Sequence, residues 1–194
     1  MKKIFTAAIC FSAFAMQSHA DYISQPPSSF QQAQTYAQMS VDQLIKAAKS
    51  GEKGAQFYLG TRLQHGVGVK SDVVQAFQWY KKAADQGLAA AQLNVGRMLV
   101  QGIGVKQDVN TGKRYLEMSA KAGDNRASYN LGMIAEQDKN YQVAYQWYEL
   151  AAREEMLDNK VMSASETRKL ALAATLTQDQ IRAARDRAYQ WITE

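Results

Sequence analysis

Few side chains in this sequence could carry out acid–base, nucleophilic or metal chemistry. Beyond the N-terminal segment there is one histidine, His65, and no cysteine. His65 has no carboxylate at a helical step from it, so it lacks the partners of a catalytic base or a metal site. Glu154 and Glu155 are neighbours in sequence, but adjacent residues on a helix point apart. We therefore expect His65 to be a surface residue at a helix end, and the protein to be no enzyme and to hold no metal or cofactor.

Two other kinds of site are also disfavoured. The glycine-rich segments 66–68 and 102–104 lack the Lys-Ser/Thr pair of a phosphate cradle, and they are predicted to follow helices rather than strands. The sequence contains no Gly-x-Ser-x-Gly, the pattern typical of serine hydrolases. An enzyme acting on the cell wall stays open as an alternative from another functional class. A module that binds a small ligand is a further one, although shallow grooves seldom enclose small molecules.

The first twenty residues have the organisation of a secretory signal peptide. Lys2 and Lys3 form a basic start, residues 4–16 are apolar, and residues 18–20 are suited to cleavage. This apolar run is too short for a membrane-spanning helix. We therefore expect an exported protein, periplasmic or secreted, whose mature chain begins near Asp21. The only cysteine lies in the signal, so disulfides are excluded from the mature chain.

The charges argue against nucleic acid and membranes as partners. A formal net charge of +5 is mild, and two of the positive charges belong to the predicted signal. Basic and acidic residues are interspersed, without the basic stripe that nucleic acid requires or a charge block for a membrane surface. No later apolar run is long enough to span a bilayer. We expect no membrane insertion after signal cleavage.

An internal repeat organises the rest of the chain. Small, turn and capping residues recur thirty-six residues apart, which indicates a helical repeat protein. Each repeat is predicted to be a hairpin of two helices. In the first, a helix over 53–65 is followed by a glycine-valine turn and by a second helix capped by Asp72. The recurring pairs are Ala55/Ala91, Gly60/Gly96, Gly66/Gly102, Gly68/Gly104, Val69/Val105, Asp72/Asp108, Ala84/Ala120 and Gly87/Gly123.

Glycine also recurs in the middle of each first helix, at Gly60, Gly96 and Gly132. Such a glycine costs about 0.5–1 kcal/mol relative to alanine. We expect close approach of the partner helix to be the reason for it. The aromatic residues that recur on the second helices are expected to pack between neighbouring hairpins. They are Trp79, Tyr80, Tyr115, Trp147 and Tyr148.

The predicted fold class is all-α: a short right-handed α-solenoid of antiparallel helix hairpins (an α-α superhelix) with capping helices at both ends. Residues 138–140 replace the glycine turn in the third repeat. Two capping boxes predict the closing helices, one opening at Ser163 and ending near Leu176, the other opening at Thr177. The predicted segments are a signal peptide (1–20), an extended or partly helical leader (21–38), helical repeats (39–155: a half repeat 41–51, then 53–87, 89–123 and 125–155) and C-terminal capping helices (156–194).

The repeated pattern of alanine, Leu-Gly, Gly-x-Gly-Val, aspartate, Trp-Tyr-x-x-Ala-Ala and a closing glycine resembles the Sel1-like repeats, relatives of the tetratricopeptide repeats with a longer turn. The resemblance covers about residues 41–155. The last helix, with its Leu-Thr-x-x-Gln start, is also similar to the tails of bacterial members. This resemblance is specific for fold, not for function, and implies a scaffold whose first helices line the concave face.

Two rows of positions on the first helices are therefore candidates for partner binding. Aromatic, aliphatic and arginine side chains together are typical of interface hot spots. The alternative is that these positions pack against neighbouring first helices. The first row is Phe57, Leu93 and Tyr129, and the second is Thr61, Arg97 and Met133.

The leading functional hypothesis is an exported, non-catalytic adaptor or regulator that binds another protein through this concave face, in the periplasm. One alternative is a periplasmic immunity protein that inhibits a secreted toxin such as a phospholipase effector. A second alternative is a secreted factor that binds a host protein.

Overall fold

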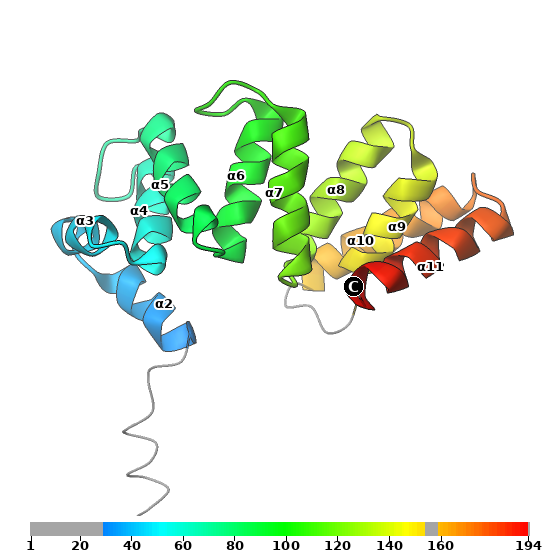
Figure 1. Ribbon diagram of the computed structural model, residues 1–194, viewed down its shortest axis with the longest axis horizontal. Coiled ribbons are helices and arrows are strands. Elements are labelled where there is room, and N and C mark those ends of the chain that lie inside the picture. The colour runs from blue at the N-terminus through cyan, green and yellow to red at the C-terminus, as the bar shows by residue number, and fades with distance from the viewer. Residues whose placement is uncertain (1–28, 154–158, 194) are drawn as a thin grey trace, which may run out of the picture. The chain divides into compact units, whose positions relative to one another are not determined.

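The computed structural model describes residues 29–153 and 159–193, and all regular elements in these ranges are α-helices (Figure 1). The predicted signal peptide, residues 21–28 of the predicted leader and the Glu154-Glu155 pair lie outside the described residues. The helices are α2 (Ser29–Gln38), α3 (Val41–Lys49), α4 (Lys53–His65), α5 (Val73–Asp85), α6 (Ala89–Gln101), α7 (Val109–Lys121), α8 (Asn125–Gln137), α9 (Tyr141–Ala151), α10 (Asn159–Ala173) and α11 (Gln178–Thr193).

Two compact units divide the chain after Gln38. In the first unit, the described part is the helix α2, where the hydroxyl of Thr35 donates to the carbonyl of Gln31 at 3.0 Å. The leader was predicted to be extended or partly helical, and its residues 29–38 are helical.

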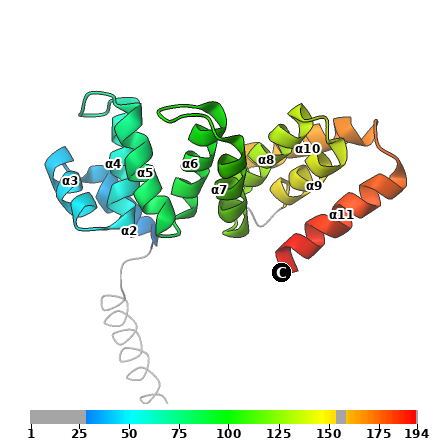
Figure 2. The same ribbon diagram turned by 45° about the horizontal axis from the view of Figure 1, so that its top comes forward.

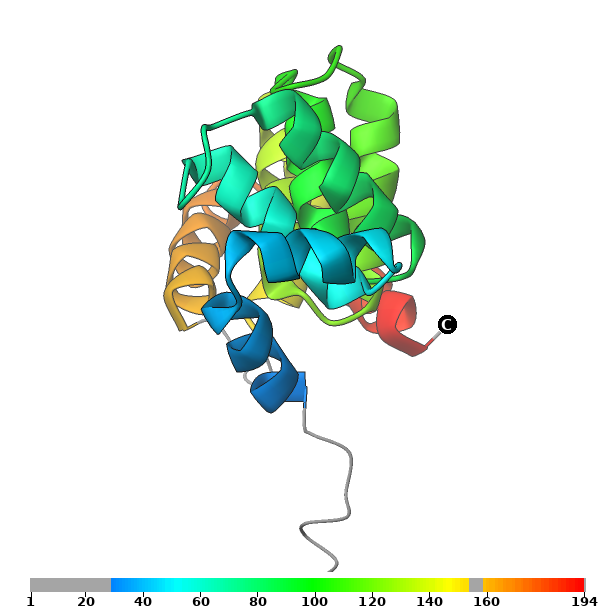
Figure 3. The same cartoon turned by 90° about the vertical axis from the view of Figure 1, so that its left-hand side faces the viewer.

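The second unit is a stack of helix hairpins. Helix α3 packs on α4, and the hairpins α4–α5, α6–α7 and α8–α9 follow, each contacting the next (Figures 1 and 2). In Figure 3 the hairpins follow one behind another from the α3 end. Helices α10 and α11 both contact α9 and close the stack. The prediction of an all-α solenoid of hairpins with capping helices is therefore confirmed.

Local sequence signals begin and end most helices where they were expected. Ser40 and Gln43 form a reciprocal capping box at the start of α3. The Asp72 carboxylate caps α5 by accepting a 2.9 Å hydrogen bond from the backbone N–H of Gln75. This bond and a second one from the Gln75 side chain hold the pKa of Asp72 below its usual value. Helix α4 ends at Gly66 with a φ of 71°, a left-handed conformation that glycine adopts without strain.

One closing helix begins earlier than predicted. We expected it to open at Ser163, but α10 begins at Asn159, so the proposed capping box lies inside the helix and Ser165 is buried there. Helix α10 packs against α8 and α9, and tertiary packing of this kind can override a local capping signal. The last helix does open as predicted, since Thr177 and Gln180 cap each other reciprocally.

Side chains of the second helices explain the glycines in the first helices. A Cβ atom on Gly60 would lie 2.9 Å from Cδ1 of Tyr80, and one on Gly132 would lie 2.6 Å from Cε1 of Tyr148. In the middle repeat, a Cβ on Gly96 would lie 2.7 Å from Cγ of Leu116. The predicted close approach within each hairpin is confirmed, and the partner in contact is a specific large side chain.

For two of the aromatic residues, the expectation of packing between hairpins was wrong. Tyr80 and Tyr148 are buried within their own hairpins, because each ring occupies the space left by a glycine. Trp147 instead reaches the closing helix, where its ring meets that of Trp191 edge-on with 4.9 Å between centroids. Tyr115 does bridge two hairpins, since its hydroxyl donates to Asp85 at 3.0 Å.

Candidate protein-interaction surface

The side chains exposed by the first helices α4, α6 and α8, together with those of α10 beside α8, form a surface that we call the A face. Helix α8 contacts both α6 and α10, so the A face is continuous across these three helices. All six sequence-predicted partner-binding residues belong to α4, α6 or α8.

The first predicted row is used mostly for internal packing. The ring of Phe57 lies 5.6 Å from that of Tyr80, and the ring of Tyr129 lies 5.6 Å from that of Tyr148. Leu93 is only 4% exposed and belongs to the core cluster that also contains Leu116. In the structure Leu93 therefore lies in the core rather than in a surface groove.

The second predicted row divides into one internal residue and two that reach the surface. Thr61 donates to the carbonyl of Phe57 at 3.0 Å and accepts from the Tyr80 hydroxyl at 3.1 Å. Arg97 is exposed and Met133 is half-buried, and both line the same depression. Of the six predicted residues, Arg97 and Met133 are therefore the pair that the fold brings together at the A face.

This depression, which we call the Arg97 depression, has a volume of about 170 Å³. Apolar side chains from three helices line part of it: Val100 from α6, Leu116 from α7, and Met133 and Ile134 from α8. Its polar lining residues are Arg97, Gln101, Asn130 and Gln137. An apolar lining with polar groups beside it is the arrangement of a small anchor site for a side chain.

A second depression of about 230 Å³, the Arg168 depression, is lined by Met133, Glu136, Gln137 and Arg168. It shares Met133 and Gln137 with the Arg97 depression, so the two form one track across α6, α8 and α10. Glu136 accepts from the Tyr148 hydroxyl at 2.7 Å, and Nη1 of Arg168 donates to both of its carboxylate oxygens at 2.9 and 3.0 Å. The negative charge of Glu136 is thus already paired.

The charges of the first helices are strongly asymmetric. Helices α4, α6 and α8 together contain one acidic residue, Glu136, against four lysine or arginine residues. Of the basic residues, Arg126 pairs with Asp124 at 2.6 Å and Arg62 donates to the carbonyl of Met39 at 2.6 Å. Arg97 has no hydrogen bond or ion pair to any residue within 29–153 or 159–193.

The charge of Arg97 also affects the pKa of Tyr80. Burial raises the pKa of the Tyr80 phenol, and the hydrogen bond to Thr61 and the charge of Arg97 partly offset this rise.

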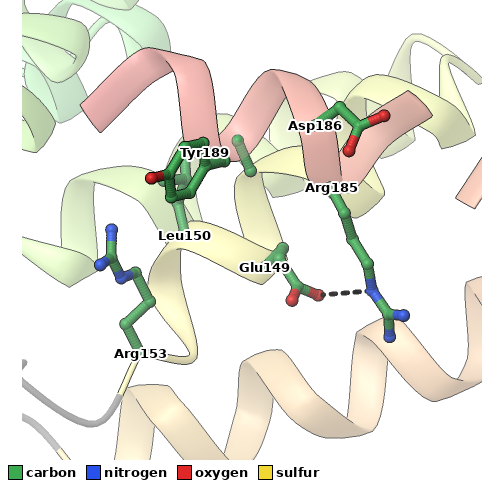
Figure 4. A pocket seen from close by; sticks show the side chains of 7 residues that line it. Glu149, Leu150, Arg153, Arg185, Asp186 and Tyr189 are labelled. Atoms are coloured by element: carbon green, nitrogen blue, oxygen red, sulfur yellow. Dashed lines mark ion pairs between the residues drawn. The ribbon is translucent and has the colours of Figure 1, made fainter. Parts of the chain in front are cut away.

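A larger hollow of about 410 Å³ lies elsewhere, between α9 and α11 (Figure 4). Leu150 and Ala188 provide its apolar lining, and Tyr189 stands beside them with 70% of its surface exposed. Glu149 is held by Lys169 at 3.1 Å and by Arg185 at 3.7 Å. The sequence analysis missed this hollow, because it is formed by helices that no repeat position relates.

Chemistry-bearing groups are sparse in the described structure. His65 is exposed at the end of α4, as predicted. Within residues 29–153 and 159–193, no three His, Cys, Asp or Glu side chains are grouped so that they could hold a metal ion. None of the helices described there combines the length and apolar character needed to cross a membrane.

Several lining residues of the A face were missed by the sequence analysis. Gln101 and Gln137 follow Arg97 and Met133 by four residues, so one further helical step would have found them. Arg168 offered no such signal, because α10 lies outside the repeats and only the fold brings it beside α8.

The repeats match a known family model, that of the Sel1 repeat, at residues 54–88, 89–124 and 125–155, just over half of the chain. No curated protein matches this chain.

Solved structures that match this chain include two at 26% sequence identity. The protective antigen c5321 of uropathogenic Escherichia coli strains, which displays an SLR fold, is 26% identical with a TM-score of 0.71 over 83% of this chain and 36% of that one. A Sel1 repeat protein from Oxalobacter formigenes is 26% identical, with a TM-score of 0.63 over 77% of this chain and 61% of that one. This chain thus spans about a third and about three-fifths of their lengths.

The immunity protein Pa5087 from Pseudomonas aeruginosa is 18% identical, with a TM-score of 0.34 over 79% of this chain and 86% of that one, and this similarity is too low to support an argument.

Proposed function

This chain belongs to the Sel1 repeat family, and we propose that it is an exported, non-catalytic module that binds another protein through its A face. Sel1 repeat proteins generally act as protein-interaction scaffolds, which supports protein binding as the class of function.

One observation carries the choice of surface: the continuous track of the Arg97 and Arg168 depressions across α6, α8 and α10. Arginine and methionine are enriched at protein interfaces, and small apolar sites surrounded by polar groups are typical of hot spots. Each depression is smaller than the roughly 300 Å³ at which pockets for small molecules begin. The track is therefore suited to side chains of a partner protein.

A capture experiment tests this proposal. The purified protein and a double variant, Arg97→Ala with Met133→Ala, are used to capture proteins from envelope and culture extracts. A matched control variant, Arg114→Ala with Met118→Ala, removes an exposed arginine and an exposed methionine from α7. We expect a partner that wild type and the α7 control retain and that the A-face variant loses. Retention of every captured protein by a well-folded A-face variant would contradict the proposal.

The captured partner also decides between the functions that a binding module could serve. An envelope component would identify an adaptor or regulator in the periplasm. A secreted enzyme that loses its activity in the complex would identify an immunity protein.

The proposal of export is supported by the N-terminal segment, in which Lys2 and Lys3 precede an apolar run over residues 4–16 and a segment suited to cleavage at 18–20. Cell fractionation followed by N-terminal sequencing tests it. We expect a periplasmic protein that begins near Asp21. A protein recovered from the cytoplasm with its first residues intact would contradict the proposal of export.

The proposal of a non-catalytic protein is supported by the exposed position of His65 and by the lack, among the described residues, of three His, Cys, Asp or Glu side chains grouped to hold a metal ion. Hydrolysis of cell-wall material by the purified protein, abolished by His65→Ala or by replacement of a carboxylate, would overturn it.

A further inference from the structure

We propose that the Arg97 depression recognises an acidic segment of the partner protein, with an aliphatic side chain seated in the depression and a neighbouring carboxylate paired with Arg97. This inference rests on the proposed function, because it names the chemistry of the segment that the A face binds.

The size of the Arg97 depression favours a single side chain of the partner protein as its occupant. At about 170 Å³ it is smaller than the sites that enclose small molecules, and its apolar lining comes from Val100, Leu116, Met133 and Ile134. Such a lining favours a leucine, isoleucine or methionine side chain, since burial of apolar surface is the main driving force of association.

The charge of the A face selects an acidic neighbour for that side chain. Arg97 is exposed and has no hydrogen-bond or ion-pair partner anywhere in the described part of the chain. A guanidinium group offers five N–H donors in a fork that matches a carboxylate. An acidic partner segment therefore supplies the groups that Arg97 lacks.

The other charged groups along the track are already matched within the protein. Glu136, the single carboxylate of α4, α6 and α8, is paired with Arg168 and accepts a hydrogen bond from Tyr148. Because of this pairing, Glu136 repels an approaching acidic segment less than an unpaired carboxylate would. Arg97 is thus the charge on the track that is available to a partner, which is why the proposal places the partner's carboxylate there.

Selection from a random peptide library displayed on phage tests the proposal and does not require the partner itself. The purified protein is the bait, and the Arg97→Glu variant and the α7 control variant are the comparisons. We expect wild type and the α7 control to enrich peptides in which Asp or Glu lies close to Leu, Ile or Met. Arg97→Glu should lose these peptides, because it replaces attraction by repulsion.

Affinity measurements on one enriched synthetic peptide then test the role of the charge directly. By fluorescence anisotropy, Arg97→Glu should weaken binding at least about tenfold, since a hydrogen bond to a charged group is lost. Arg97→Lys should retain part of the affinity, and added salt should weaken binding to wild type. Affinity that is insensitive to both Arg97→Glu and salt would overturn the proposal.

The selection separates failure of this inference from failure of the proposed function. The selection could instead enrich neutral or basic peptides that the double variant Arg97→Ala with Met133→Ala does not bind. That outcome would keep the A face as the binding surface and overturn the proposal that the partner segment is acidic. Enriched peptides that the double variant still binds, or no enrichment above an unrelated bait, would count against both.

Discussion

The side-chain amide of Gln86 donates a 2.7 Å hydrogen bond to the side-chain oxygen of Gln56, across the first hairpin. Gln56 in turn donates to the carbonyl of Ala48 at 3.2 Å, so one buried glutamine ties its repeat to the preceding helix. Gln92 repeats half of this arrangement, since its amide donates to the carbonyl of Ala84 at 3.3 Å. The residue thirty-six positions after Gln86 is Ala122, and Oε1 of Gln92 is buried without a donor in the described structure.

Ala122→Gln should therefore stabilise the protein. The new amide would donate to Oε1 of Gln92 and raise the free energy of unfolding by about 0.5–1.5 kcal/mol. Chemical denaturation followed by circular dichroism measures the change. Ala122→Met is the control, because it adds a side chain of similar length without a donor. A gain of equal size in both variants would show that the hydrogen bond is not the cause.

Gly96→Leu should destabilise the second hairpin. A Cβ atom at this position would lie 2.7 Å from Cγ of Leu116 and 3.0 Å from the backbone oxygen of Gly112, and backbone cannot move aside as a flexible side chain can. We expect a loss of more than about 2 kcal/mol, despite a gain in helix propensity of about 1 kcal/mol. Thermal unfolding compared with Gln78→Leu, a control at a position of α5 that is not buried, tests this. An unchanged melting temperature would contradict the observed hairpin packing.

Tyr148 should make the stability of the protein sensitive to alkaline pH. Burial and the hydrogen bond to Glu136 raise the pKa of the Tyr148 phenol above its usual value of 10.0. The unfolded chain therefore loses this proton first. The stability contributed by neutral Tyr148 is complete below about pH 10 and is lost as the pH rises from there toward the folded-state pKa.

Denaturation of wild type and Tyr148→Phe from about pH 8 to about pH 11 measures this contribution. Wild type should lose stability more steeply than the variant above about pH 10. Parallel curves for the two proteins would show that the Tyr148 proton is not linked to folding.

Trp191→Ala should loosen the closing helix. The Trp191 ring meets that of Trp147 at 4.9 Å between centroids and packs against the core cluster that contains Leu93, Leu116 and Trp147. Loss of an aromatic pair and of its buried apolar surface should lower the free energy of unfolding by about 2 kcal/mol. Tyr189→Ala, on the same helix but 70% exposed, is the control and should change stability by less than about 0.5 kcal/mol. Equal effects of the two substitutions would argue against a closing role for Trp191.

Much of the fold could be predicted because its signals are local and repeated. The 36-residue spacing of Gly60 and Gly96 established the hairpins, and Asp72 and Thr177 marked helix starts that the structure confirms. The start of α10 was misplaced for the opposite reason. Helix α10 packs against α8, which is distant in sequence, and a local capping pattern carries no information about such contacts.

The candidate surface was predicted only in outline. Equivalent repeat positions placed Leu93 and Arg97 on the same helix, one turn apart, and both appeared equally suited to a partner. In the structure Leu93 is core and Arg97 is exposed. Burial depends on which neighbouring helix covers each side chain, and sequence periodicity alone leaves that neighbour unspecified.

By itself, then, the sequence determined the helices, the turns and the repeat, because hydrophobic periodicity, caps and glycines act through residues close along the chain. Only the tertiary structure decided that hydrogen bonds of Tyr148, Glu136 and Arg168 join three helices. It also decided that Arg97 lies beside an apolar depression and that Arg97 has no hydrogen-bond or ion-pair partner in the described part of the chain. These relationships depend on distances between side chains that are far apart in sequence, and such distances exist only once the hairpins have packed.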